Sequence, residues 1–259
     1  MFEKKHYLVF DCEGTNDTAT FGDGKDDKPQ LPYDCSGVIM ERDGTIVDRF
    51  AYLCKEVFTD CKLMDSAFYK RKMPEYLDRI ANGEIDPMSA SDIFTNLNAL
   101  CEEYNIPDMW AYNADYDVNA LRNLFTKYRR KHGFDRESAQ KVLALRPRDI
   151  MTAAVESLVG PRKYYKFIKE HGYFSGKNNV RYGAEFMYQF ITGDTTFQEE
   201  HKGLDDAIIE SEILARVFAA KKKVNGDLAP KYYYSRVNAK CKHEGGSKPV
   251  GRPRKVTCD

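Results

Sequence analysis

The sequence lacks a long apolar run. No uninterrupted apolar stretch approaches the roughly 18–20 residues of a membrane-spanning helix, and the apolar run Tyr7–Phe10 is too short for a signal peptide. It also lacks any CxxC pair, although it has seven cysteines, an odd number. We therefore expect no membrane partner and no secretion, with reduced thiols in a cytoplasmic, intracellular compartment.

The chain has no net charge either, with 40 Lys+Arg against 40 Asp+Glu in 259 residues. Taken alone, this balance argues against a nucleic-acid partner. The zero is nevertheless the sum of two opposite parts, because residues 221–259 hold 11 basic and 3 acidic side chains and the first 220 hold 29 and 37. This asymmetry predicts one domain over residues 1–222, and a basic, weakly ordered tail over residues 223–259.

The order of apolar patterns predicts a mixed α/β fold. Strands are expected at 7–13, 36–40, 45–54 and 109–112, with a hairpin turn at Asp43-Gly44 that makes the first part of the sheet antiparallel. Helical periodicity follows at 91–104, 115–131, 146–172, 182–191 and 204–222, with a loop at 172–181. Strands first, and then helices around a further strand, are typical of a sheet flanked by helices.

Asp11 and Glu13 interrupt the first, otherwise apolar strand. Because side chains alternate along a strand, both carboxylates project to the same face near its end. Two like charges side by side repel each other unless a cation lies between them, and Mg²⁺ and Mn²⁺ prefer oxygen ligands. The alternative is a strand end that emerges into solvent, and these two residues alone leave both open.

Two later segments also carry acids at places where sites form. Asp117 comes just after the strand at 109–112, where it is either a first-turn aspartate favoured by the helix dipole or a metal ligand. Asp206 begins the last helix, and His201 precedes it on a loop where we expect the imidazole to be free to move and to face solvent.

Together the three segments resemble the motifs of the DEDDh, or DnaQ-like, 3′→5′ exonuclease family. FDCE at 10–13 resembles the family's DxE motif, NADYD at 113–117 its second motif, and HKGLDD at 201–206 its HxxxxD motif. The sister subclass has tyrosine four residues before the last aspartate, where this chain has Lys202, so the histidine subclass is the better match. The resemblance spans residues 6–220.

The resemblance implies an RNase H-like fold and two divalent cations, Mg²⁺ or Mn²⁺. Matched by motif, the metal-binding carboxylates would be Asp11, Glu13, Asp117 and Asp206, and His201 would be the general base. Two metals clamp the attacking and leaving oxygens of a phosphoryl displacement, and the ordinary pKa of histidine suits removal of a proton from water. Thr15 and Asn113 would contact the substrate, although Gly14-Thr15-Asn16 departs from the family's usual run after DxE.

The tail suggests where the nucleic acid is held. Gly251-Arg252-Pro253 resembles the core of an AT-hook, which lays arginines in the minor groove of AT-rich DNA. Arg252, Arg254 and Lys255 are therefore candidate contacts. The usual arginine before the glycine is Val250 here, so a generic basic tail for any polyanion is the alternative.

These features predict a metal-dependent 3′→5′ exonuclease that releases nucleoside 5′-monophosphates from a single-stranded 3′ end, with DNA slightly favoured over RNA. Its use in proofreading would imply a polymerase partner, and its use in trimming would not. An RNA-trimming exoribonuclease is the alternative within the same chemistry. A non-catalytic nucleic-acid-binding or interaction protein on the same fold is the alternative of another class.

Overall fold

The computed structural model describes residues 5–15, 30–67, 69–159, 161–175, 179–221 and 223–228. At its centre lies a six-stranded sheet in the order β4-β3-β2-β1-β5-β6. The first three strands along the chain are β1 (His6–Gly14), β2 (Pro32–Glu41) and β3 (Ile46–Cys54), and the others are β4 (Asp86–Met88), β5 (Asp108–Ala111) and β6 (Arg146–Asp149).

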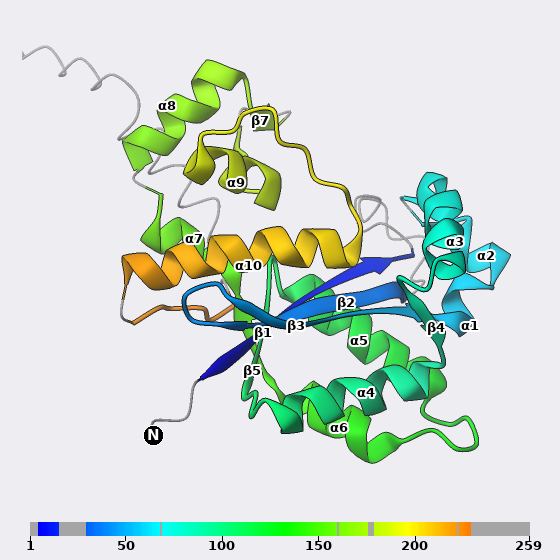
Figure 1. Cartoon of the computed structure of the whole chain (residues 1–259). Helices are drawn as coiled ribbons and strands as arrows, with labels where there is room; N and C mark the ends of the chain where they lie inside the picture. The colour runs from blue at the N-terminus through cyan, green and yellow to red at the C-terminus, as the bar shows by residue number, and fades with distance from the viewer. Residues whose placement is uncertain are drawn as a thin grey trace, which may run out of the picture.

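The sheet is mixed, as predicted. Strand β1 pairs antiparallel with β2, and β2 with β3, through a tight turn in which Gly44 adopts a φ of 97° that favours glycine. The pairs β1–β5, β5–β6 and β3–β4 are parallel. Strand β1 therefore has an antiparallel neighbour on one side and a parallel neighbour on the other, and it lies in the interior of the sheet (Figure 1).

Helices cover both faces of the sheet (Figure 1). On one face, α4 (Ala90–Glu103), α5 (Asp115–Tyr128) and α6 (Arg136–Ala144) enclose a core that includes Leu8 and Phe10 of β1. On the other, α7 (Ile150–Ser157) and α10 (Gly203–Ala220) cover Tyr7 and Val9, with α8 (Pro161–His171) and α9 (Ala184–Thr192) packed beyond them. The alternation along β1 therefore continues with Asp11 and Glu13 on the α10 face.

The remaining elements lie at the two ends of the molecule. Between β3 and β4 come α1 (Lys55–Phe58), α2 (Cys61–Met64), the 3₁₀ turn η2 (Lys70–Lys72) and α3 (Met73–Ala81). Strands β7 (Phe174–Ser175) and β8 (Asn179–Val180) pair with each other between α8 and α9. None of the helices formed by the described residues is both long and apolar enough to span a membrane.

The region 146–172, predicted to hold further helix, contains α7 and α8 but begins with strand β6. Its four residues have no apolar alternation, but they pair with β5, and the side chain of Arg146 binds Asp108 at 2.7 Å. Pro147 is tolerated because β6 is an edge strand. Asp149 then caps α7 by accepting a hydrogen bond from the Thr152 backbone.

The first residues of the predicted tail contact the domain. The carbonyl of Gly226 accepts a hydrogen bond from the Asp149 backbone at 2.7 Å, and Asp227 binds Arg148 at 2.6 Å. Gly226 is buried against Trp110, where a methyl group would come within 2.5 Å of the indole ring. The predicted contacts Arg252, Arg254 and Lys255 lie outside the described residues, and they stay predictions.

Candidate active site

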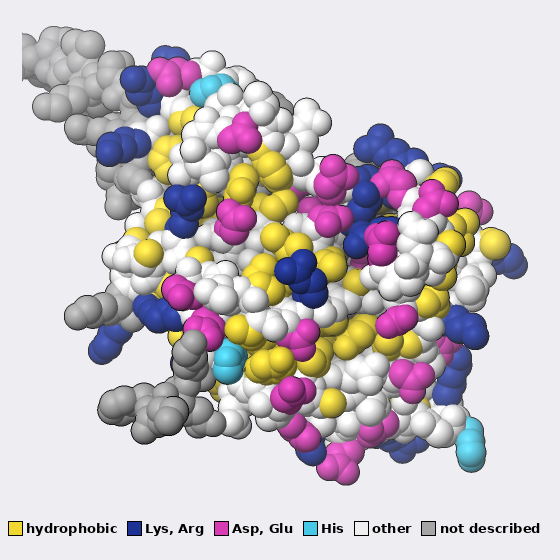
Figure 2. Space-filling model, in the orientation of Figure 1, with side chains coloured by type: hydrophobic (Ala, Val, Ile, Leu, Met, Phe, Trp, Pro, Cys, Tyr) yellow, Lys and Arg dark blue, Asp and Glu magenta, His cyan; other side chains and the backbone are white. Residues whose placement is uncertain are grey.

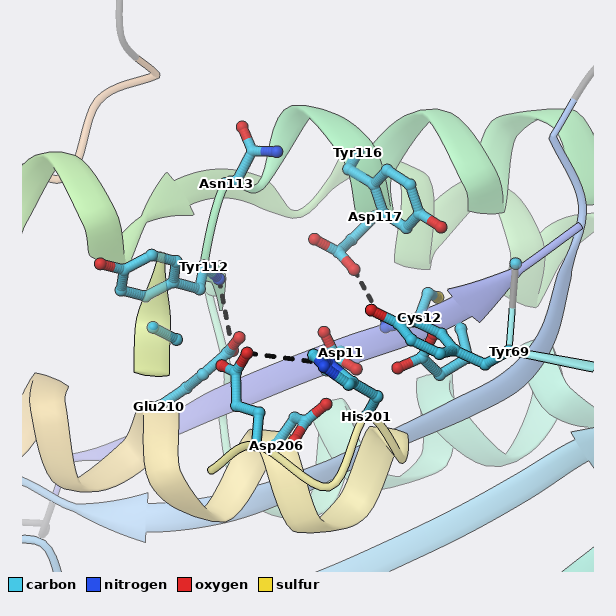
Figure 3. Close-up of a pocket in the computed structure, with 14 residues that line it drawn as sticks. Asp11, Cys12, Tyr69, Tyr112, Asn113, Tyr116, Asp117, His201, Asp206 and Glu210 are labelled. Carbon is cyan, nitrogen blue, oxygen red and sulfur yellow. Dashed lines mark hydrogen bonds and ion pairs between the residues drawn. The ribbon is translucent and has the colours of Figure 1, made fainter. Parts of the chain in front are cut away.

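A cavity of about 430 Å³ opens beside the carboxyl-terminal end of strand β1. Three parts of the chain form most of its wall: the end of β1, the junction between β5 and α5, and the start of α10 (Figure 3). Its charged lining residues are Asp11, Glu13, Asp117, Glu199, His201, Asp206 and Glu210. All five residues predicted as metal ligands or general base thus line one cavity.

Asp11, Glu13 and Asp206 form the tightest group. One carboxylate oxygen from each lies within 4.8 Å of the others, although Asp206 is almost 200 residues further along the chain. Asp11 and Glu13 project from β1 toward α10, and Asp206 lies in the first turn of α10 and faces them. Asp11 Oδ2 and Asp206 Oδ1 are buried and accept no hydrogen bond from any described residue.

Asp117 approaches the same cavity from α5. It lies in the first turn of α5, as predicted for an aspartate favoured by the helix dipole. Unlike an ordinary surface aspartate, however, it is only 1% exposed. Its Oδ1 accepts a hydrogen bond from the backbone N–H of Cys12 at 3.0 Å, so the carboxylate is fixed beside the end of β1 (Figure 3). Asp115, two residues earlier, is exposed.

Glu210 is a fifth buried carboxylate that the sequence reasoning missed. It lies one helical turn after Asp206, is 4% exposed, and accepts a hydrogen bond from the Tyr112 backbone N–H at 3.3 Å (Figure 3). The sequence does contain a signal for it, because Glu210 is an acidic residue on the face of α10 that otherwise carries core residues such as Ala207 and Leu214.

Burial raises the pKa of each carboxyl in this cluster, and repulsion from neighbouring acids adds to the effect for most of them. The affected residues are Asp11, Glu13, Asp117, Asp206 and Glu210. For Asp206, burial and then the charge of Glu199 raise the pKa to about 8. Burial raises the pKa of Glu199 itself to about 7.

His201 lies on the loop before α10, as predicted. The prediction that its imidazole is free to move and faces solvent is wrong. The imidazole stacks on the ring of Tyr69, with the centroids 4.4 Å apart and the planes 15° from parallel, and the His201 side chain is 33% exposed. The backbone adopts a φ of 51°, an uncommon conformation for a non-glycine residue. Burial, followed by the nearby charge of Lys72, lowers the pKa of His201.

The two predicted substrate contacts are placed differently. Asn113 lines the cavity, is exposed, and has a φ of 66° at the turn between β5 and α5. Thr15 is fully buried, and it pairs with Leu31 through its backbone N–H at 2.9 Å and its Oγ1 at 3.2 Å. Thr15 is therefore outside the cavity lining, whereas Asn113 is part of it.

The side chains present fit hard divalent cations. Every acidic lining group offers oxygen, the ligand that Mg²⁺ and Mn²⁺ prefer, and two of these buried oxygens accept no hydrogen bond from the described residues. Buried carboxylates at this density are stabilised only by protons or by cations between them. The three oxygens within 4.8 Å could hold such ions.

Comparisons with solved structures agree with the sheet order and helix placement. The nuclease domain of 3'hExo, a DEDDh family member bound to rAMP, superposes with a TM-score of 0.50 at 12% identity, over 87% of this chain and 98% of that one. The chain has the fold of the DnaQ-like exonucleases. Exonuclease I from E. coli, in its zinc-bound ssDNA complex, matches with a TM-score of 0.50 at 11% identity.

That second match covers 85% of this chain and 42% of exonuclease I, so the chain spans less than half the length of that enzyme. The same enzyme in complex with a dA16 oligonucleotide matches at 10% identity, again with a TM-score of 0.50. Protein-family models and curated protein sequences gave no match. At these identities the likeness is one of fold, the RNase H-like mixed sheet with flanking helices.

Proposed function

We propose that this protein is a metal-dependent 3′→5′ exonuclease that hydrolyses the terminal phosphodiester of a nucleic-acid strand and releases nucleoside 5′-monophosphates. The observation that carries the proposal is the convergence of Asp11, Glu13 and Asp206, with oxygens within 4.8 Å, beside a histidine in the same cavity. Asp117 enters from a third element. The DnaQ-like fold supports the same activity class.

The carboxylates Asp11, Glu13, Asp117 and Asp206 would hold two cations, Mg²⁺ or Mn²⁺. Bound there, the cations would supply positive charge to the attacking and leaving oxygens of an in-line displacement. The carboxylates fix the place of that charge, because β1, α5 and α10 each contribute at least one of them.

His201 would accept the proton of the attacking water. Its lowered pKa keeps the imidazole neutral near pH 7, so that it can take up a proton there. Asn113, exposed at the opposite part of the cavity wall, would contact the terminal nucleotide (Figure 3). Glu210 would hold the end of β5 against α10 through the Tyr112 N–H.

The proposed substrate is a single-stranded 3′ end, and proteins of this fold bind a ribonucleotide in one case and single-stranded DNA in another. The nuclease domain of 3'hExo is bound to rAMP and E. coli exonuclease I to ssDNA. An exoribonuclease is therefore the second candidate, and the proposed preference for DNA rests on the partial AT-hook of the tail. The polymerase partner expected for a proofreading role gains no support from these comparisons.

A strand-length assay tests the activity. Wild-type protein is mixed with 5′-labelled single-stranded DNA, duplex DNA or RNA, together with Mg²⁺, Mn²⁺ or EDTA, and should produce a metal-dependent descending ladder. Asp11→Asn should abolish cleavage and keep the fold, and the exposed Asp115→Asn serves as the matched control. His201→Ala should lose at least ~10²-fold, the usual scale for a general base.

No ladder on any substrate would refute the activity, and a wild-type rate in His201→Ala would refute the role of the histidine. Calorimetric titration with Mn²⁺ separates the metal site from turnover. Wild-type protein should bind the ion and Asp11→Asn should bind it weakly. A protein that binds Mn²⁺ and nucleic acid but cleaves none of the three substrates would instead be a non-catalytic nucleic-acid-binding protein, which is the alternative to an enzyme.

A further inference from the structure

The helical stretch between β3 and β4 reaches the loop that carries His201. We call residues 69–79 the bracing segment and residues 199–203 the histidine loop. The bracing segment contains η2 and most of α3, and none of the three sequence motifs includes it. In Figure 1 these elements lie at the end of α10 where the histidine loop enters the helix.

Two lysines join the segment to the loop. Lys72 Nζ donates a hydrogen bond to the backbone carbonyl of Glu200, and Lys202 Nζ binds Glu75 at 2.6 Å. The two lysine side chains are only 12% and 15% exposed, so they are ordered against the protein, whereas the Glu75 carboxylate is 51% exposed and its pair with Lys202 is screened by solvent. The bracing segment and the histidine loop each supply one lysine, and basic and acidic side chains are interspersed over α3 on this face of the molecule (Figure 2).

A buried network extends this contact into the sheet. Asp34 of β2 accepts hydrogen bonds from the hydroxyl of Tyr76 at 2.7 Å and from the backbone N–H of Gly203 at 3.1 Å. A side chain at position 203 would place its first carbon 3.0 Å from Asp34 Oδ1, which explains the glycine there. The last residue of the histidine loop is therefore fixed to β2 and α3 together.

The ring of Tyr69 completes these contacts at the imidazole itself. His201 has a φ of 51°, a conformation that is unfavourable for a non-glycine residue and persists only where its surroundings hold it there. The stacking distance of 4.4 Å and the near-parallel planes are typical of direct ring contact. Tyr69 also lines the cavity, so the pair stands at the site and not on a remote surface.

Taking the proposed function as its basis, we propose that Tyr69 is a positioning residue whose ring fixes the plane of the His201 imidazole beside the carboxylates. Tyr69 acts through His201 and takes up no proton itself. Besides the ring of Tyr69, the imidazole has the Glu199 carboxylate 3.8 Å from its Nδ1, a separation too long for a hydrogen bond. Since a displacement of about 1 Å can cost 10²-fold in rate, a histidine without the Tyr69 ring would be a poorer base. The rest of the bracing segment keeps the histidine loop within reach of that ring.

Two substitutions separate the ring from its hydroxyl. In the strand-length assay, Tyr69→Ala should lower kcat by about 10- to 100-fold with KM within about twofold, because orientation is lost while the cavity stays open. Tyr69→Phe keeps the ring and should restore kcat to within about threefold of wild type. Thermal unfolding of both variants checks that each one folds.

A chemical readout tests the positioning without any turnover. Diethyl pyrocarbonate modifies accessible imidazoles, and mass spectrometry reports the rate at each histidine. Because the His201 side chain is 33% exposed, loss of the covering ring should raise its rate by roughly two- to threefold in Tyr69→Ala and leave it unchanged in Tyr69→Phe. The exposed His132 provides the internal reference.

Tyr104→Ala is the matched control, because Tyr104 contacts the imidazole of His6, with ring centroids 5.2 Å apart, away from the cavity. It should change the modification of His6 and leave both His201 and kcat as in wild type.

Faster modification of His201 with lowered kcat, in Tyr69→Ala alone, supports the proposal. Unchanged modification, or a Tyr69→Phe as defective as Tyr69→Ala, overturns it. If wild type cleaves nothing, the proposed function fails while the modification rates still decide whether Tyr69 holds the ring.

Discussion

Replacing Asp206 by asparagine should make the metal-free protein more stable at pH 7 and should also weaken its response to divalent cations. Asp206 has a pKa of about 8 in the folded chain, against an ordinary value of 3.8, because it is buried and lies near Glu199. Asparagine keeps the size of the side chain and carries no charge. The exposed Asp115 of α5 provides the matched control Asp115→Asn.

The sign follows from proton binding. Between pH 4 and pH 8 the folded chain keeps the Asp206 proton that the unfolded chain has lost, so the folded state binds more protons and the free energy of unfolding falls as pH rises. One such proton contributes about 1.4 kcal/mol per pH unit, or about 3 kcal/mol between pH 5 and pH 7. The loss is complete above the folded pKa, and Asp206→Asn should lack this contribution.

Urea unfolding in EDTA at pH 5, 6, 7 and 8 measures the effect, with the fluorescence of Trp110, the single tryptophan, as the signal. Excess Mn²⁺ should then stabilise wild type by about 2.7 kcal/mol at 100 times the dissociation constant, and should stabilise Asp206→Asn far less. The reasoning would be refuted by a wild-type stability that rises from pH 5 to pH 8 in EDTA. It would equally be refuted by identical slopes for wild type and Asp206→Asn.

Three further changes test the fold and the tail. Gly37→Ala would place a methyl group 2.5 Å from the Val9 carbonyl and 2.6 Å from the Phe50 ring, so urea unfolding should show a loss of about 1–3 kcal/mol. Tyr76→Phe removes a donor to the buried Asp34 and should cost about 1–3 kcal/mol in the same measurement, with a small change counting against the network. Removal of residues 229–259 should weaken DNA binding and flatten its dependence on salt, as followed by fluorescence anisotropy, and an unchanged slope would leave the tail without this role.

The parts of the site that could be predicted depend on local periodicity. The alternation of β1 placed Asp11 and Glu13 on one face, and the capping region of α10 placed Asp206 in its first turn, because both patterns act within a few residues. The resemblance to the DEDDh motifs then added Asp117 and His201 to the same prediction. The mixed sheet followed from the order of strands and the Asp43-Gly44 turn.

The parts that were missed depend on contacts between distant segments. Glu210 stands on an apolar stripe, and nothing in its neighbourhood along the chain shows that it faces other acids. The Tyr69 ring meets His201 across 132 positions of sequence, where polar contacts such as Lys202–Glu75 and Arg79–Asp205 join α3 to the start of α10. Strand β6 is formed by its pairing with β5 and by the Arg146–Asp108 ion pair rather than by its own residues.

Helix α10 carries its site acids and its core residues on one continuous face. Asp206 and Glu210 occupy the same stripe as Leu214 and Val217, each about one turn beyond the last. A one-residue insertion between them would rotate the following part of the helix by about 100° and turn its apolar side chains to solvent. The spacing of the acids is therefore bound to the register of the hydrophobic core, so that any sequence change preserving one must preserve the other.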